Sequence, residues 1–348
     1  MPDMTVSVVI PTRNRAESLY RLLGAVARQE RVPDEVIVVD ASDRPLLHQT
    51  LLQACPGLKL EYAHTSPSVC AQRNLGLRRA TGTHVWLCDD DIEPPPAYLR
   101  QLAAFLSNAP VEGAATGIWL ERDATGAFPD GLPVPSFRHM LLNFMAQRSL
   151  WGDVEGARGT WLTAAPLRGL KAWYRHRGNT WSLAGWPLLT QVRGRVVRTA
   201  IYSLGAALVR RDWLTASLFD ERLGPHGIGD NYGVALGFPR DLPIAILTDV
   251  RLRHHRSTDN RLDVATAHRE RALALHYFLR THPRFRTLNR LFLIWSLLWN
   301  TLQFAVQNQR DLFRATVTAL RQILTGRNPL LQDAALPGQS LNDRRHQP

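Results

Sequence analysis

The chain has 348 residues, of which 45% are hydrophobic and 21% are charged. This length and balance exclude a collagen, a disulfide scaffold and a wholly disordered chain, and they allow about two domains. Lysine plus arginine exceed aspartate plus glutamate by 42 − 30 = 12, which favours an anionic partner such as phosphate groups, an acidic membrane surface or nucleic acid. Only Lys59 and Lys171 are lysines, and we attribute this preference for arginine to codon bias.

The three cysteines, Cys55, Cys70 and Cys88, show no metal-binding spacing. An odd number of cysteines without a visible disulfide pattern predicts a reduced, cytoplasmic protein. The first residues run directly into a strand-like segment, so we expect no signal peptide.

The first 105 residues alternate short apolar runs with segments of helical periodicity, which predict strands and helices respectively. Strands are expected over 5–11, 35–40, 59–63 and 84–88, and helices over 17–29, 44–54 and 66–80, the last with Ser66 as N-cap. Apolar strands that alternate with helices form parallel sheets covered on both faces. We therefore expect an α/β fold with a mostly parallel central sheet flanked by helices, which binds its ligand beyond the carboxyl ends of the strands.

The rest of the chain has weaker local signals. We interpret 121–197 as an insertion over the active face, with helices near 137–150 and 165–176. Strands are expected over 199–209 and 244–252, on either side of a Gly- and Asp-rich stretch at 219–237, and a helix over 263–282. The predicted organisation is one domain over 1–260, with halves at 1–105 and 199–260, a helical extension over 261–325 and a disordered tail over 326–348.

Residues 288–316 have the pattern of an amphipathic helix. Polar residues fall on one narrow stripe, from Asn289 through Ser296, Asn300 and Gln303 to Arg314, and most of the remaining surface is apolar. The polar residues recur too often for a spanning helix. A broad apolar arc with basic flanks is typical of a helix lying in a membrane interface, and packing against the domain or a second subunit explains the pattern equally well.

Three consecutive carboxylates, Asp89, Asp90 and Asp91, follow the apolar run that ends at Cys88. Such a cluster at the end of a buried strand is costly unless a positive group lies within it. Oxygen ligands suit Mg²⁺ or Mn²⁺, and Mg²⁺ is typically held by one or two carboxylates together with substrate phosphates. We predict a metal that bridges the protein and a diphosphate; the alternative is an acidic loop that caps the helix following Pro94.

Two later motifs carry candidate functional groups. His254 and His255 follow a predicted strand, and either could ligate the metal as a neutral imidazole, with His254 favoured and Asp89 as the alternate carboxylate. Asp230 follows a glycine-rich turn and is a candidate general base for an attacking hydroxyl. An ordinary turn aspartate is the alternative interpretation.

The remaining candidates lie near the ends of the first strands and on the helix before the acidic cluster. Asp40 could hydrogen-bond a base or ribose, or cap the turn that follows it. Arg73 could contact phosphate oxygens. Pro11, Thr12 and Arg15 could line the same pocket or form a plain connecting loop.

Three segments in this order resemble the family 2 glycosyltransferases, which have the GT-A fold: VSVVIPTRNR, EVIVVDAS and AQRNLGLRRATGTHVWLCDDDIEPPPAYL. The later segment SLGAALVRRDWLTASLFDERLGPHGIGDNYGVALG is similar to the acceptor-side region of the family, and RLRHH to the segment with its late metal-ligand histidine. The resemblance implies an inverting hexosyltransferase that uses a nucleotide-diphosphate sugar, with UDP expected, and Mn²⁺ or Mg²⁺.

By this resemblance, Asp40 would contact the nucleobase, Arg73 the donor phosphates, and Asp89 or Asp90 the ribose. Asp91 and His254 would ligate the metal.

Asp230 would be the catalytic base by the same resemblance. The family often has an acidic pair at the base position, such as Glu-Asp, whereas this chain has Gly229-Asp230-Asn231.

The amphipathic pattern of 288–316 suggests an acceptor for such a transferase. We expect a glycan or lipid-linked hydroxyl in the synthesis of surface polysaccharide, lipopolysaccharide or glycolipid. The protein would then act in the cytoplasm, peripherally at the inner face of the plasma membrane through 288–316, as a monomer or a homo-oligomer.

Other functions predict other patterns. A nucleotidyltransferase usually has a glycine-rich loop after the first strand, whereas residues 12–15 contain no glycine. A non-catalytic nucleic-acid or anionic-surface binder needs basic residues gathered with aromatics, whereas the arginines here are dispersed, so we expect no nucleic-acid partner. A degenerate transferase that acts as a scaffold would not keep the acidic triad and the late histidines.

Overall fold

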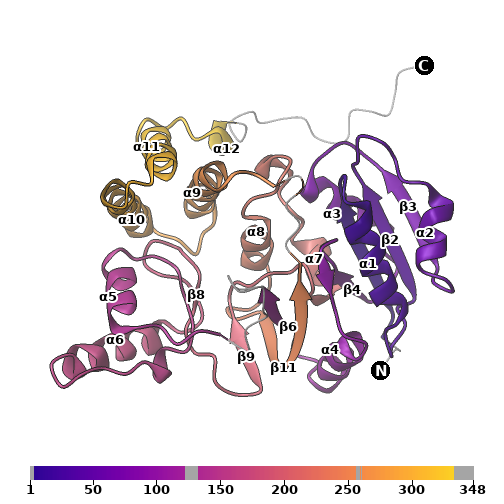
Figure 1. Ribbon diagram of the computed structural model, residues 1–348, viewed down its shortest axis with the longest axis horizontal. Coiled ribbons are helices and arrows are strands. Elements are labelled where there is room, and N and C mark those ends of the chain that lie inside the picture. Colours follow the sequence, from indigo (N-terminus) through magenta and orange to yellow (C-terminus); the bar gives the residue numbers. More distant parts are fainter. Residues whose placement is uncertain (1–3, 122–131, 256–258, 260, 333–348) are drawn as a thin grey trace.

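The computed structural model describes residues 4–121, 132–255, 259 and 261–332. These residues form a central mixed sheet with helices around it (Figure 1). Nine strands of this part of the chain form the sheet, in the order β3-β2-β1-β4-β10-β6-β11-β5, with β9 also paired to β11. Their bounds are β1 Val6–Thr12, β2 Glu35–Asp40, β3 Leu60–His64, β4 His84–Leu87, β5 Ile92–Glu93, β6 Ala114–Glu121, β9 Val196–Thr199, β10 Leu208–Arg210 and β11 Ile244–His254. The α/β fold with a central sheet flanked by helices is confirmed.

The first four strands are parallel, as predicted, with β1 between β2 and β4. Because β1 is buried on both faces of the sheet, its alternate side chains pack into two different hydrophobic clusters. Val8 belongs to the cluster on one face and Val9 to the cluster on the other. The helices of this half are α1 Ala16–Ala27, α2 His48–Ala54, α3 Val69–Arg79 and α4 Tyr98–Asn108. The N-cap of α3 is Ser68, whose side chain accepts a hydrogen bond from the Ala71 amide, so the predicted start at Ser66 was wrong.

The second half of the sheet departs from a purely parallel arrangement. β10 lies antiparallel between β4 and β6, whereas β6 and β11 are parallel. The strand predicted over 199–209 was wrong, because 200–207 forms a buried loop between β9 and β10. That loop crosses the carboxyl end of β4, where the Gly205 carbonyl accepts a 2.7 Å hydrogen bond from the Asp89 amide.

The segment predicted as an insertion forms a smaller unit beside the sheet. It contains β7 Leu150–Trp151, β8 Leu188–Leu189, and the two predicted helices as α5 Phe137–Met145 and α6 Ala164–Arg177. Met140, Leu150, Leu170 and Tyr174 form part of its own hydrophobic cluster. Two further short helices, α7 Arg211–Ala216 and α8 Asp230–Leu236, return the chain to the sheet.

The C-terminal helices pack together and against the core that includes α8 (Figure 1). They are α9 Val264–Thr281, α10 Thr287–Val306, α11 Arg310–Leu324 and α12 Pro329–Gln332. The helix predicted over 288–316 is therefore interrupted, and Asn308 takes a left-handed conformation (φ 55°) at the break. Asn328 is fully buried and α12 follows it, so the predicted disordered tail is wrong for 328–332, whereas 333–348 lie outside the described residues.

The polar stripe of α10 faces inward and its apolar arc faces outward. Ser296 and Asn300 are buried, and they accept hydrogen bonds from Trp186 Nε1 (3.0 Å) and Arg148 Nη1 (3.3 Å). Six apolar side chains of α10 are 47–79% exposed: Leu288, Leu291, Trp295, Leu298, Leu302 and Val306. No helix in the described part of the chain combines the length and the apolar character needed to cross a bilayer.

Candidate active site

A cavity of about 790 Å³ lies at the carboxyl ends of β1 and β4 and reaches α8 and α9. Nine of the predicted site residues line it: Pro11, Thr12, Arg15, Arg73, Asp89, Asp90, Asp91, Asp230 and His254. The parallel strands explain part of this convergence, since residues after the carboxyl ends of β1 and β4 meet at one edge of the sheet. Asp40 and His255 are not among the residues that line the cavity.

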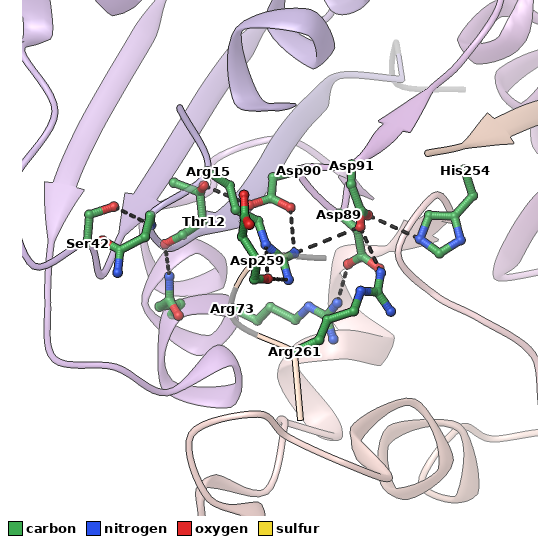
Figure 2. Close-up of polar contacts among 12 residues, drawn as sticks. Thr12, Arg15, Ser42, Arg73, Asp89, Asp90, Asp91, His254, Asp259 and Arg261 are labelled. Carbon is green, nitrogen blue, oxygen red and sulfur yellow. Dashed lines mark hydrogen bonds and ion pairs between the residues drawn. The ribbon is translucent and has the colours of Figure 1, made fainter. Parts of the chain in front are cut away.

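The three consecutive carboxylates point toward different cationic side chains (Figure 2). Asp89 pairs with Arg73. Asp90 accepts hydrogen bonds from Thr12 Oγ1 at 2.8 Å and Arg15 Nη1 at 3.1 Å.

Asp91 has partners on both of its oxygens. Oδ1 lies 3.2 Å from His254 Nε2, and Oδ2 lies 2.9 Å from Arg261 Nη2. Every member of the acidic cluster therefore has a basic neighbour.

Burial and the charged partners have opposite effects on the pKa values of Asp90, Asp91 and His254. Burial raises the pKa of Asp90 to about 6, against the opposing effect of Arg15. Asp91 is also buried, but its hydrogen bond and charge interaction with His254, together with Arg261 and Arg15, hold its pKa well below the ordinary value. Burial alone would lower the pKa of His254, whereas Asp91 and Glu121 raise it to about 9.

Asp230 is the first residue of α8 and is positioned by the turn before it. Gly229 has φ 100°, a left-handed conformation that favours glycine. One Asp230 oxygen pairs with Arg73 Nη1, and the other accepts the Asn231 amide at 2.6 Å. Burial raises the pKa of Asp230, opposed by the charge of Arg73, so this carboxyl group is a stronger base than a solvated aspartate.

Arg73 is 4% exposed and connects the acidic cluster to Asp230. Its guanidinium group pairs with Asp89 on one side and Asp230 on the other, and it stacks 5.0 Å from the Phe219 ring centroid. The predicted contact of Arg73 with donor phosphates stays a prediction. The structure adds a second interaction, in which Arg73 holds the candidate base beside the acidic cluster.

Asp40 holds the loop that follows β2 through hydrogen bonds. Its carboxylate accepts hydrogen bonds from the amides of Ser42 (2.8 Å) and Leu46 (3.1 Å) and from Tyr62 Oη (2.9 Å). This geometry matches the turn-capping alternative, and contact with a nucleobase stays a prediction. His255 Nε2 forms a 2.7 Å hydrogen bond with Glu93 Oε2. Of the two histidines, His254 is therefore the one whose imidazole lies beside the Asp91 carboxylate.

Several cavity residues had no recognisable signal in the sequence. Arg261 is one of many arginines, and Glu121 is the last residue of a strand that was not predicted. The aromatic residues Trp119, Trp151 and Tyr202 also line the cavity. Trp119 stands edge-on to His254 with ring centroids 4.9 Å apart, and Trp151 stacks on Tyr202 at 5.5 Å.

The donor atoms present suit a divalent cation that shares its ligands with a substrate. No group of three or more metal-ligating side chains occurs in the described residues. Asp91 Oδ1 and His254 Nε2 form a pair 3.2 Å apart, which fits a metal that takes its other ligands from water and phosphate oxygens. Ligation would replace the His254 proton, since only neutral imidazole binds a metal.

Comparison with solved structures defines the class of fold. The chain matches the crystal structure of GalNAc-T7 with UDP, GalNAc and Mn²⁺ with a TM-score of 0.52 and 14% identity, over 80% of this chain and 49% of that one. It matches S. aureus TarS 1-349 in complex with UDP-GlcNAc with a TM-score of 0.51 and 14% identity, over 98% and 95% of the two chains. At these identities the likeness shows the fold alone, which is the GT-A fold.

Sequence comparison then gives the similarity to known families. The model of glycosyl transferase family 2 matches residues 7–162. The uncharacterized glycosyltransferase YwdF of Bacillus subtilis is 34% identical over 107 residues, which are 30% of this chain and 40% of that protein. Chondroitin synthase of Escherichia coli is 28% identical over 153 residues, 43% of this chain and 20% of that protein. The chain thus spans less than half the length of both curated relatives.

Proposed function

We propose that this protein is an inverting glycosyltransferase that moves a sugar from a nucleotide-diphosphate donor to a hydroxyl acceptor. One observation carries the proposal: the buried carboxyl group of Asp230 lines the same cavity as the paired side chains of Asp91 and His254. A candidate base and a candidate metal-diphosphate site therefore share one space at the end of the sheet. That is the arrangement needed for direct displacement at an anomeric carbon.

Six cavity residues have a part in the proposed reaction. Asp230 accepts the proton of the acceptor hydroxyl as its oxygen attacks the anomeric carbon. Arg73 supplies positive charge toward the departing diphosphate. Asp91 and His254 would hold Mn²⁺ or Mg²⁺, which supplies Lewis-acid stabilisation when bound, and Asp89 or Asp90 would bind the ribose.

The experiment that tests the function is a screen of nucleotide sugars for thermal stabilisation with and without Mn²⁺. A ligand that binds the folded state raises its stability by RT ln(1 + [L]/Kd), so a donor present at 100 Kd adds about 2.7 kcal/mol. UDP-sugars are expected to stabilise the protein most, and TarS and GalNAc-T7 were both solved with UDP or a UDP-sugar. Release of pyrophosphate in place of a nucleoside diphosphate would indicate a nucleotidyltransferase.

Gly205 offers a test of the Asp89 position. A Cβ atom at Gly205 would lie 2.2 Å from Asp89 Oδ2, so Gly205→Ala is expected to push Asp89 away from Arg73 and to lower kcat/KM at least tenfold. Gly169→Ala is the matched control, since a Cβ there meets no atom within 4 Å. Steady-state kinetics on both variants measures the effect, and equal activities would show that the Asp89 position is unimportant.

We further propose that the exposed arc of α10 binds the inner face of an anionic membrane, where surface-glycan or glycolipid acceptors are built. The exposed positions follow one another at intervals of three or four residues, from Leu288 to Val306, and none of the six is polar. Trp295 lies in this arc, as expected of a helix at a lipid interface. Arg290, Arg310 and Arg314 of α10 and α11 supply positive charge toward anionic lipid headgroups.

The variant Leu291→Gln/Leu298→Gln is expected to reduce binding to phosphatidylglycerol-containing vesicles at least tenfold in a sedimentation assay, because it removes two exposed leucines from the arc. The control Leu47→Gln/Leu218→Gln changes two leucines that are also exposed but lie elsewhere, and should bind as wild type. A wild-type chain that ignores the vesicles would contradict the proposal. Dimerisation that is lost in the α10 variant would instead assign the arc to a second copy of the chain.

A further inference from the structure

A second cavity, also of about 790 Å³, lies beside the first, among α5, α9 and α10. The two cavities share four lining residues: Trp151, Trp186, Pro187 and Arg271. A ligand in the second cavity would therefore lie next to the space in front of Asp230. Neither the family resemblance nor the proposed chemistry gives this second cavity a role.

The charge of the second cavity is one-sided. Five basic residues line it, of which three are arginines that carry its positive charge, and none of the described residues that line it is acidic. The basic residues are Arg138, His139, Arg148, His268 and Arg271. The first cavity differs, since Asp89, Asp90, Asp91, Glu121 and Asp230 balance its arginines.

The arginines of the second cavity lack the carboxylate partners that arginines have in the first. Arg138 and Arg271 are exposed to solvent, and within the described residues their side chains make no hydrogen bond or ion pair, whereas Arg15, Arg73 and Arg261 are all paired with aspartates. Arg148 is held by the neutral amides of Asn300 and Gln303. Its Nε is shielded from solvent and has no hydrogen-bond partner in the part of the chain described. A shielded donor without a partner is costly, so Arg148 Nε favours an external anion.

The inward polar stripe of α10 forms one wall of this cavity. Asn300 and Gln303 line the cavity, as does Gln307 at the end of the helix. Asn300 and Gln303 position Arg148, and all three side chains add neutral hydrogen-bonding groups without adding negative charge. This accounts for the orientation of α10, whose polar side serves a cavity while its apolar side faces outward.

We propose that the second cavity binds an oxyanion, a phosphate or carboxylate group, carried by the acceptor. Guanidinium groups bind both kinds of oxyanion through paired, charge-assisted hydrogen bonds. With the anion held near Arg138, Arg148 and Arg271, the acceptor would extend past Trp186 and present its hydroxyl to Asp230. The assignment of the anion to the acceptor rests on the proposed transferase function. The binding of an anion in the second cavity does not depend on that function.

Isothermal titration calorimetry on the full chain tests the site, with pyrophosphate and glucuronate as probes and with UDP and Mn²⁺ present to fill the donor site. We expect at least one probe to bind, and Arg138→Ala to weaken its binding at least tenfold. Arg138 lines the second cavity and not the first. The double variant Arg138→Ala/Arg271→Ala should lose binding altogether.

The matched control is Arg100→Ala/Arg195→Ala, which removes two charges from exposed arginines outside both cavities. It should bind the probes as wild type does. If this control lost as much probe affinity as the Arg138 variants, the loss would be due to net charge alone, and the proposal would be overturned. Failure of both probes to bind wild type, or undiminished binding by Arg138→Ala, would also overturn it.

The choice of probe identifies the source of the anion. Pyrophosphate binding indicates a phosphate-bearing acceptor, and glucuronate binding indicates an acidic glycan. Thermal stabilisation by nucleotide sugars, measured on the same samples, separates the two proposals. If no donor stabilises the chain while the probes bind through Arg138, the transferase function fails and the oxyanion site stands.

Discussion

Replacing Asp230 with asparagine is expected to lower kcat at least a hundredfold while donor affinity changes less than threefold. General-base catalysis typically contributes 10²–10⁴-fold, and asparagine has nearly the same shape but cannot accept the hydroxyl proton. The change also removes the partner of a buried guanidinium group, since Arg73 pairs with Asp230. Arg73 keeps its ion pair with Asp89, so the variant is expected to fold.

The pH dependence of kcat/KM gives a second measurement. The active form of Asp230 is the deprotonated one, so activity is lost as the pH falls through its pKa. Because burial raises that pKa, the contribution of Asp230 to the acidic limb should lie above pH 3.8 in wild type. The variant should lose this contribution and keep only those of the donor- and metal-binding groups.

Asp220→Asn is the matched control for Asp230→Asn. Asp220 is a partly buried aspartate that binds Tyr277 and Arg222 and does not line the cavity. Its replacement should leave the acidic limb in place. Unchanged turnover in Asp230→Asn would remove Asp230 from the role of base.

The residue after Asp230 has a structural role of its own. Asn231 Oδ1 accepts a hydrogen bond from the Leu204 amide at 3.3 Å. This bond ties the start of α8 to the loop that carries Gly205, which in turn contacts Asp89. An acidic residue at 231 would add a like charge beside Asp230, so asparagine positions the loop without further raising the pKa of the base.

The part of the fold that depends on local pattern could be predicted. Each strand of the first half is a short apolar run followed by a helix, and parallel pairing brings the residues after β1 and β4 to one edge of the sheet. Thr12 and Asp90 are 78 residues apart and are joined by a hydrogen bond. The order of chain elements predicted that Asp40 and the acidic cluster share a crevice, with Thr12 as a further candidate. Thr12 and the cluster do line one cavity, whereas Asp40 does not.

The rest depends on contacts that no local pattern records. Arg261 reaches Asp91 across 170 residues, and nothing in the sequence separates it from the other arginines. A divalent cation was predicted to be the positive group within the acidic cluster, whereas arginines and His254 already surround it. The amphipathic pattern of α10 likewise does not tell which side of the helix faces the protein. Its polar side is buried because Asn300 and Ser296 accept hydrogen bonds from Arg148 and Trp186, which lie in a distant segment of the chain.

Replacing Asp91 with asparagine is expected to abolish the Mn²⁺-dependent part of donor binding, which means a loss of at least a hundredfold in affinity. Of the three carboxylates, Asp91 is the one that lies against His254, and its low pKa keeps it ionised and able to ligate. Calorimetry with the nucleotide sugar, with and without Mn²⁺, measures the loss. The same variant removes one charged partner from each of Arg261 and His254, so its melting temperature without ligand must be measured alongside.

The adjacent histidines provide the control for this result. Both imidazoles contact a carboxylate, but His254 contacts Asp91 and Glu121 whereas His255 contacts Glu93, away from the cavity. His254→Ala is therefore expected to weaken Mn²⁺-dependent donor binding tenfold or more, and His255→Ala to change it less than twofold. Because the two residues are neighbours on one chain segment, a general loss of stability would affect both variants, and only ligation by His254 predicts the difference. Tight Mn²⁺-dependent binding by Asp91→Asn, or a larger effect at His255 than at His254, would show that the metal is held elsewhere.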